Sequence, residues 1–322
     1  MLLIITNKSD ITTDYLILRL QERNIPYLRL NTEDYLKKYQ ITMSINKSNI
    51  KSSILFEDGS IFDITKFKSV YFRHPVKPSL NSNIFEEDLE FAEREVLETL
   101  RSLWRIINIK KWINHPKFLW AANNKIEQLK VARKIGFNIP STLITTIPDE
   151  IIQFYNKYNG DIIGKAVKHG FYKYRKKVVI ANTQKIDISF INNLSNYAKI
   201  PMIFQKNIRK MFDIRVTVID NEVYATSIHS QAHKETRIDW RVWDLIDNLD
   251  LLHKPIKLPH LLSDICIKIT RKFNLRYSAI DLVQTPDNKY YFLELNPNGQ
   301  WAWIEKIVGH PIRDSLIKSF GY

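Results

Sequence analysis

Two acidic residues near the C-terminus, Asp281 and Glu294, stand in a pattern that could hold a metal ion. Two apolar runs flank the turn sequence Thr-Pro-Asp-Asn-Lys at 285–289, and together they predict a β-hairpin. A hairpin symmetric about the Asp287–Asn288 bond places Asp281 opposite Glu294. Asn296 lies two residues beyond Glu294 and therefore on the same face of its strand. Three oxygen ligands are thus predicted to converge.

These three ligands favour magnesium. The two carboxylates have apolar neighbours, and like charges in such surroundings repel each other unless a cation lies between them. An all-oxygen donor set without histidine or cysteine suits Mg²⁺, which fills its other positions with water and phosphate oxygens. The alternative is a hairpin with a polar solvent face. The polar loop 296–301 at the strand end favours a binding site.

The arrangement of Asp281 with the string ELNPNGQW (294–301) resembles the metal-binding end of ATP-grasp ligases. In that family the Asp, Glu and Asn side chains hold Mg²⁺ on ATP. The longer string ELNPNGQWAWIE, together with ETRIDWR at 235–241, resembles the graspetide (microviridin-type) peptide ligases in particular. The resemblance extends in pieces from about Val70 to the C-terminus. It implies that Asp281, Glu294 and Asn296 are the metal ligands and that ATP and Mg²⁺ are the cofactors.

Composition and charge set broad limits on the function. With 44% hydrophobic and 25% charged residues the composition is that of an ordinary globular protein. Cys266 is the single cysteine, so no disulfide framework can form and the cytoplasm is the expected compartment. No segment predicts a signal peptide or a membrane span. The net charge of +14 favours an anionic partner, which includes nucleic acid, ATP and a carboxylate-rich peptide.

The expected fold class is α/β (α+β), an ATP-grasp fold with an N-terminal α/β pre-ATP-grasp domain. Short apolar strands alternate with helical patterns over residues 1–115, which form the first domain. Residues 116–200 are expected to form a central ATP-grasp subdomain, and residues 201–322 a C-terminal subdomain with the metal site. The stretch 112–124 is interpreted as a linker, and a helix is predicted for 125–135 between asparagine caps and Gly136.

Two lysines are predicted to bind nucleotide phosphates. Lys165 interrupts the apolar strand pattern 162–167, and a buried ammonium is costly unless an anion pairs with it. The resemblance places phosphate-contacting basic residues at such a strand and at the start of a helix, where Lys125 stands. It also places the adenine-binding hinge in one segment, which comprises Gln205, Lys206, Asn207 and Ile208.

Two arginines are predicted to be catalytic. Arg215 shares a strand face with Asp213, so it either forms a salt bridge with that residue or binds an anionic ligand. In the resembled family an arginine of this motif contacts the transferring phosphate. Arg237 matches the ETR position of the family and is expected to stabilise the acyl-phosphate step. Arg237 and Arg241 would share a face if their segment were helical.

The remaining site residues are predicted to contact substrate. Arg73 and His74 close a strand, where they either touch substrate or form a surface turn. The basic and aromatic segment 168–177, with Lys173 and Arg175, stands where many ATP-grasp enzymes have a glycine-rich flap. It has one glycine, and we expect it to hold an acidic peptide by charge or by β-addition. Asn298 lies in the polar loop after the last strand.

The predicted function is ATP-dependent, ADP-forming ligation through an acyl phosphate. Glu or Asp side chains of a ribosomal precursor peptide, made of a leader and a core, would be joined to Ser or Thr hydroxyls or Lys amines, which forms macrocycles. One alternative is an ATP-grasp ligase acting on a small molecule or a protein tail, and another is a basic nucleic-acid-binding protein. The resemblance implies a cytoplasmic homodimer that binds the precursor and neither nucleic acid nor membrane.

Overall fold

This computed structural model describes all residues except 81–84, 169–170, 175–176, 181, 198–199 and 247–248. The fold begins with a parallel β-sheet. Its strands are ordered β2-β1-β6-β7 and all run parallel; they comprise β1 (Leu2–Thr6), β2 (Tyr27–Asn31), β6 (Ser69–Phe72) and β7 (Lys111–Ile113). Strands β1 and β6 are buried throughout, because both faces of the sheet are covered.

Helices and a small antiparallel sheet cover the two faces of this parallel sheet. Helix α1 (Ile11–Glu22) begins after Asp10, whose side chain accepts a hydrogen bond from the Thr13 backbone. Helix α2 (Glu86–Ile106) packs on the opposite face with Leu100, Leu103 and Trp104. The antiparallel strands are β3 (Tyr39–Ile45), β4 (Ile50–Phe56) and β5 (Ile61–Asp63). The Asp58-Gly59 turn joins β4 to β5, and Gly59 has a φ of 83°.

The stretch 112–124, predicted to link two domains, is an ordered segment. It contains the end of β7 and helix α3 (Pro116–Ala122), which His115 caps. Helix α4 (Lys125–Ile135) then follows with the predicted bounds. The Asn124 side chain accepts from two backbone amides at its start, and Gly136 ends it in the left-handed conformation at φ 109°.

A second, antiparallel sheet has the order β12-β9-β13-β8. Its strands are β8 (Thr142–Thr145), β9 (Ile162–Lys165), β12 (Gln184–Lys185) and β13 (Met202–Lys206). Helix α5 (Pro148–Lys157) and the short helices α6 (Ile188–Asn192) and α7 (Leu194–Tyr197) pack on it. Strands β10 (Phe171–Tyr174) and β11 (Lys177–Ile180) pair as a separate hairpin.

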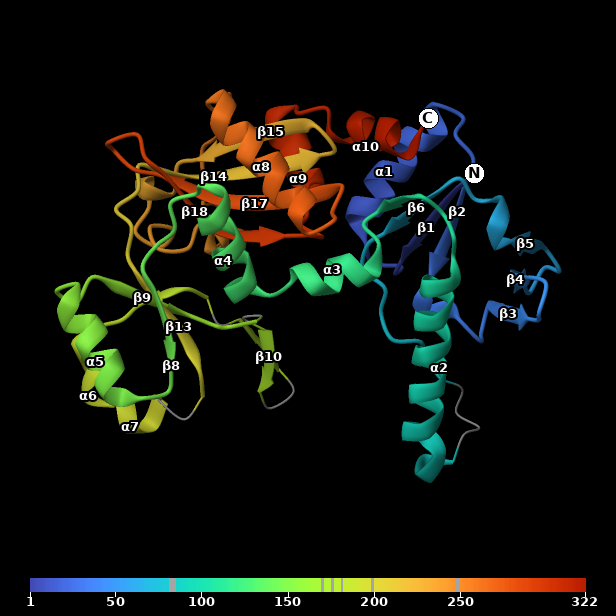
Figure 1. Cartoon of the computed structure of the whole chain (residues 1–322), viewed down its shortest axis with the longest axis horizontal. Coiled ribbons are helices and arrows are strands. Elements are labelled where there is room, and N and C mark those ends of the chain that lie inside the picture. The colour runs from blue at the N-terminus through green and yellow to red at the C-terminus, as the bar shows by residue number, and fades with distance from the viewer. Residues whose placement is uncertain (81–84, 169–170, 175–176, 181, 198–199, 247–248) are drawn as a thin grey trace.

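The third large sheet carries the predicted metal site. Its antiparallel order is β16-β15-β14-β17-β18, from β14 (Phe212–Ile219), β15 (Glu222–Ile228), β16 (His253–Ile256), β17 (Tyr277–Gln284) and β18 (Tyr290–Asn296). Alternate residues such as Ile214, Ile280 and Leu295 pack against α4 and α8 (His260–Lys272). The intervening residues therefore point to the other face, toward the second sheet (Figure 1).

The C-terminal helices return to the N-terminal sheet. Helices α9 (Ala302–Val308) and α10 (Ile312–Phe320) are separated by Gly309 at φ 75°. One core joins them to the first sheet and includes Leu2, Ile4, Leu16, Tyr71, Trp301, Leu316 and Phe320. The two ends of the chain thus share a core. Within the described residues no helix is long and apolar enough to cross a membrane.

Candidate active site

The hairpin of β17 and β18 brings Asp281 directly opposite Glu294, as predicted. The register beside the turn differs from the prediction, because Gln284 pairs with Tyr290 and Leu282 with Phe292. A bulge between Asp281 and Leu282 then shifts the register by one residue. The bulge thus restores the expected pairing at the carboxylates.

Arg215 of β14 forms a buried ion pair with Asp281. The Arg215 Nη1 atom donates to Asp281 Oδ1 at 2.8 Å, and the two side chains are only 8% and 10% exposed. Burial raises the pKa of Asp281, Arg215 opposes this rise, and the negative charge of Glu294 adds to it. The structure pairs Arg215 with Asp281 and not with Asp213, the salt-bridge partner considered for it.

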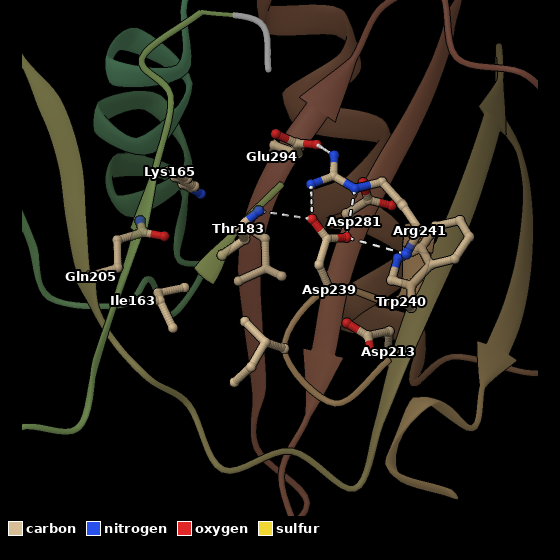
Figure 2. A pocket seen from close by; sticks show the side chains of 12 residues that line it. Ile163, Lys165, Thr183, Gln205, Asp213, Asp239, Trp240, Arg241, Asp281 and Glu294 are labelled. Carbon is tan, nitrogen blue, oxygen red and sulfur yellow. Dashed lines mark hydrogen bonds and ion pairs between the residues drawn. The ribbon is translucent and has the colours of Figure 1, made fainter. Parts of the chain in front are cut away.

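Glu294 is held by cations from two other elements, and Figure 2 shows one of them, Arg241. Arg241 Nη1 lies 3.0 Å from Glu294 Oε1, and Lys125 Nζ lies 3.4 Å from Glu294 Oε2. Burial alone would raise the pKa of Glu294, but the surrounding cations outweigh burial and lower the pKa. Glu294 is therefore ionised, and the predicted phosphate ligand Lys125 contacts the predicted metal ligand Glu294.

Arg241 and its partner Asp239 belong to the site although neither was predicted to. Asp239 accepts hydrogen bonds from Arg241 Nε and Nη2, both at 2.8 Å, and one from the Thr183 backbone at 3.2 Å. Burial opposes the ionisation of Asp239, yet these bonds lower its pKa. The sequence signal was the ETRIDWR string, but the 3₁₀ helix begins only at Trp240, so Arg237 does not share a helical face with Arg241.

An open cleft with about 470 Å³ of space lies between the second and third sheets. Lys165 reaches it from β9, while Asp281 and Glu294 face it from β17 and β18 (Figure 2). Burial, with the nearby charges of Lys125 and Arg241, lowers the pKa of Lys165 to about 8, although Glu294 opposes this. The second sheet thus presents an ammonium group, and the third sheet presents two carboxylates.

The residues predicted to form the adenine-binding hinge lie in different surroundings, because side chains alternate between the two faces of a strand. Gln205 is fully buried and lines the cleft, and its Nε2 donates to Thr142 Oγ1 at 2.9 Å. The Oε1 atom of Gln205 has no hydrogen-bond partner among the described residues. Lys206 instead lies over the Tyr158 ring at 5.7 Å, and Asn207 bonds to Asp161. Lys206, Asn207 and Ile208 do not line the cleft.

Asp213 is a further buried carboxylate that lines the cleft. Lys210 Nζ donates to its Oδ1 at 2.8 Å, and Ser230 Oγ donates to its Oδ2 at 2.5 Å. Burial raises the pKa of Asp213, and these hydrogen bonds oppose the rise. The two charged residues of the sequence Asp213-Ile214-Arg215 therefore have different partners. Asp213 bonds to Lys210 and Ser230, whereas Arg215 pairs with Asp281.

The residues present fit Mg²⁺. Within the described residues no group of three or more His, Cys, Asp or Glu side chains could hold a metal ion. The protein ligands of a metal here would therefore be the carboxylates of Asp281 and Glu294 and the amide oxygen of Asn296. That small oxygen set suits a metal completed by water and phosphate oxygens. Within the described residues the Oδ2 atom of Asp281 accepts no hydrogen bond, and Asn296 Oδ1 accepts one, from Asn298 N at 3.0 Å. Both atoms keep a lone pair for a metal.

Arg73 joins the N-terminal sheet to the loop that follows β18. It is 2% exposed, and its guanidinium donates to Asn298 Oδ1, to Gly299 O and to Gln300 Oε1 at 3.0 to 3.1 Å. The surface turn considered for Arg73 is therefore wrong. His74 is half-buried beside it, and burial, with the charge of Arg73, lowers the pKa of His74 to about 4.

Gly299 fits this loop because it has no side chain. A Cβ atom there would lie 2.5 Å from Ala279 Cβ and 3.0 Å from Arg215 Nη2. The loop thus lies against the arginine that pairs with Asp281, and Asn298 bonds both to Arg73 and to the predicted ligand Asn296.

Of the other predicted site residues, the structure places Arg237 away from these contacts. Lys173 is in strand β10, and Arg175 lies outside the described residues. Arg237 is exposed, and its Nε donates to Gln231 O at 3.4 Å. It does not line the cleft, whereas Arg241 does.

Family models match both parts of the chain. The model for the MvdD pre-ATP grasp domain matches residues 1–118, and the model for the RimK-like ATP-grasp domain matches residues 122–320. Among curated proteins, the alpha-aminoadipate–LysW ligase LysX of Sulfurisphaera tokodaii is 21% identical over 209 residues, which cover 65% of this chain and 70% of LysX.

Solved structures share the fold over nearly the whole chain. A RiPP-associated ATP-grasp ligase of Chryseobacterium gregarium, in complex with ADP and a leader and core peptide, is 25% identical and has a TM-score of 0.88, covering 98% of this chain and 94% of that chain. The macrocyclase MdnC of Microcystis aeruginosa, bound with precursor peptide MdnA, is 22% identical with a TM-score of 0.84, covering 98% of each chain. The expected ATP-grasp fold is confirmed. Since the RimK-like model covers more than half of its residues, the protein belongs to the RimK-like ATP-grasp family, whose enzymes are ATP-dependent ligases that use ATP and Mg²⁺.

Proposed function

We propose that this protein ligates side chains within a ribosomal precursor peptide. A Glu or Asp carboxylate of the peptide attacks the γ-phosphorus of ATP, the bond to the β–γ bridging oxygen breaks, and ADP leaves. A Ser or Thr hydroxyl, or a Lys amine, then attacks the acyl phosphate, loses its proton and displaces phosphate. The product is an ester or amide ring, and the peptide has lost one water per ring.

One observation carries this proposal. Two facing carboxylates, Asp281 and Glu294, lie in a cleft between two sheets and are bracketed by cations; these are Lys125, Lys165, Arg215 and Arg241. Cations around a cleft stabilise the negative charge of phosphates and of a phosphoryl-transfer transition state. Mg²⁺ held by Asp281, Glu294 and Asn296 would supply further charge neutralisation when bound.

Residues of the protein itself would bind the nucleotide and stabilise the developing charge. Lys125 and Lys165 would bind phosphate oxygens, and the fixed guanidiniums of Arg215 and Arg241 would neutralise developing charge without reorganisation. The unpartnered Oε1 of Gln205 is a buried acceptor in the cleft, which suits an amine such as that of adenine.

Further residues are assigned to the peptide. Arg237 lies exposed on the segment leading to Arg241, and Lys173 lies in the hairpin of β10 and β11. The predicted substrate contacts of Arg175, His74 and Asn298 are part of the proposal, with Arg73 holding the Asn298 loop. The proposed enzyme has domains 1–115, 116–200 and 201–322 and works as a cytoplasmic homodimer without nucleic acid or membrane.

Mass spectrometry of a precursor incubated with the enzyme, ATP and Mg²⁺ tests the proposal. We expect Asp281→Asn and Glu294→Gln to abolish the loss of water, because each removes a carboxylate of the site. The matched control is Asp287→Asn, in the exposed turn of the same hairpin, which should leave product formation unchanged. Full product formation by the two site variants, in folded protein, would contradict the proposal.

A second candidate is ligation of a small molecule or a protein tail. The match to LysX, named as a ligase of alpha-aminoadipate and LysW, favours it. It uses the same nucleotide and metal residues but needs no leader peptide. Consumption of ATP with amino-acid or protein-tail acceptors, together with unchanged masses of all precursor peptides, would support this candidate instead.

A further inference from the structure

The parallel sheet of the N-terminal domain has a topological switch point between β1 and β6. The chain passes from β1 to β2 on one side and then returns to β6 on the other side of β1. Open α/β sheets of this kind bind their ligands outside the carboxyl ends of the strands at such a point. The residues that follow the two strands, 7–10 and 73–76, therefore stand where a ligand of this sheet would lie.

In this protein the Asn298 loop, which comprises residues 298–300 after β18, lies at the switch point. Arg73 Nη1 donates to the backbone and side-chain oxygens of Asn298, both at 3.0 Å, and to Gly299 O at 3.1 Å. Its Nη2 donates to Gln300 Oε1 at 3.0 Å. The loop thus offers four oxygens to one guanidinium of the N-terminal domain, as a bound ligand would.

Arg73 is itself held from the side of the N-terminal domain. Asp10 Oδ2 lies 3.8 Å from Arg73 Nε, and the two side chains are each 1% exposed. The hydroxyls of Thr6 and Thr13 donate to the same Asp10 oxygen at 2.7 and 2.6 Å. Because a buried guanidinium is costly without a counter-ion, Asp10 supplies the charge that keeps Arg73 buried against the loop.

The Asn298 loop also contacts the predicted metal site at two points. The backbone N–H of Asn298 donates to Asn296 Oδ1 at 3.0 Å, which orients the amide of that predicted ligand. Gly299 lies so close to Arg215 that an added Cβ would be 3.0 Å from Arg215 Nη2. Arg215 in turn pairs with one of the two carboxylates of the site. The loop therefore connects Arg73 to both ends of the predicted ligand set.

We propose that Arg73 is a positioning residue for the metal site and that the N-terminal domain binds the Asn298 loop in place of a ligand. Arg73 acts on Asn296 through Asn298, and on Arg215 through Gly299. Residues that orient metal ligands in this way typically change metal affinity by about 10- to 100-fold when they are replaced. Arg73 has this role only if the metal site of the proposed function exists, whereas the identity of the substrate does not affect it.

Binding of Mn²⁺, used in place of Mg²⁺, tests the proposal without measuring catalysis. Mn²⁺ is titrated into the enzyme–ADP complex, with enzyme in excess over ADP, and electron paramagnetic resonance measures the free ion. Arg73→Met removes the donors that hold the loop, so we expect the Mn²⁺ dissociation constant to rise by about tenfold or more. The matched control is Arg19→Met, because Arg19 joins α1 to Asp314 of α10 at 2.8 and 2.9 Å and its partners lie outside the loop. This control should bind Mn²⁺ like wild type.

A second variant separates positioning from stability. Asp10→Asn combined with Arg73→Met removes both buried charges, so its midpoint of thermal unfolding should lie above that of Arg73→Met. Its Mn²⁺ affinity should stay as weak as that of Arg73→Met, because the loop still lacks its donors. Circular dichroism establishes that each variant is folded, and the double variant carries the test if Arg73→Met does not fold.

Steady-state kinetics with a precursor peptide gives a further readout. Arg73→Met should lower kcat and leave the peptide KM within about twofold of wild type, because Arg73 acts on the metal site and not on the peptide. Raising the Mg²⁺ concentration should restore part of kcat.

Wild-type Mn²⁺ affinity in folded Arg73→Met or in the double variant would overturn the proposal. So would Mn²⁺ affinity that recovers together with stability in the double variant, since Arg73 would then be structural only. A raised peptide KM with unchanged Mn²⁺ affinity would instead assign Arg73 to peptide binding. The titration contains no peptide, so a failure to form rings with any precursor would contradict the proposed function without affecting this result.

Discussion

Replacing Arg215 by methionine removes the guanidinium that pairs with Asp281 at 2.8 Å while keeping an unbranched side chain. Removing one partner of a buried ion pair costs about 3–5 kcal/mol, because the remaining charge regains neither its partner nor water. At about 2–4 °C per kcal/mol, the midpoint of thermal unfolding should fall by roughly 6–20 °C. A loss of about 3–5 kcal/mol is a large share of a typical free energy of unfolding of about 5–15 kcal/mol.

Two further measurements test whether the unpaired charge of Asp281 causes the loss of stability. Adding Asp281→Asn to Arg215→Met removes that charge, so the double variant should recover about half of the loss or more. In the single variant the pKa of Asp281, already raised by burial, rises further. The folded state then binds a proton more tightly than the unfolded chain. The single variant is therefore most stable at acidic pH and loses stability as the pH rises through the folded pKa of Asp281.

The assay is thermal unfolding followed by circular dichroism, without Mg²⁺, at several pH values. Arg209→Met is the matched control, because Arg209 is an exposed arginine in the loop before the same strand, and it should unfold like wild type. The reasoning is refuted if Arg215→Met unfolds at the temperature of this control. It is also refuted if the double variant is less stable than the single variant.

Four other substitutions give three further predictions for the site. Arg241→Ala should lower kcat by about 100-fold or more, whereas Arg237→Ala should chiefly raise KM for the peptide; steady-state kinetics would separate the two effects. ATP affinity should fall as the pH rises through about 8, where Lys165 loses its proton, and Lys165→Arg should abolish that fall in calorimetric titrations. Gly299→Ala should weaken Mg²⁺ binding, measured by titration, because the new Cβ would crowd Arg215. Equal kcat in the two arginine variants, an unchanged pH profile in Lys165→Arg, or wild-type Mg²⁺ affinity in Gly299→Ala would contradict the respective prediction.

Local sequence determined the elements whose signals lie within a few residues. Asparagine before and glycine after residues 125–135 fixed helix α4, because capping groups act on the adjacent turn. The turn at 285–289 and the alternation of β17 and β18 placed Asp281 opposite Glu294. The bulge beside Asp281 had no such signal, and the predicted register beside the turn was wrong by one residue.

Tertiary structure decided which cations reach those carboxylates. Arg241 and Glu294 are 53 positions apart, and Arg73 and Asn298 are 225 apart, so no local pattern relates them. Tertiary packing also decided which face of strand β13 lies in the cleft. Gln205 faces the cleft, while its neighbour Lys206 faces Tyr158. Sequence by itself therefore placed the two carboxylates opposite each other on one hairpin. Only the packing of separate sheets decided their charged surroundings, because electrostatic interactions depend on distance in space and not along the chain.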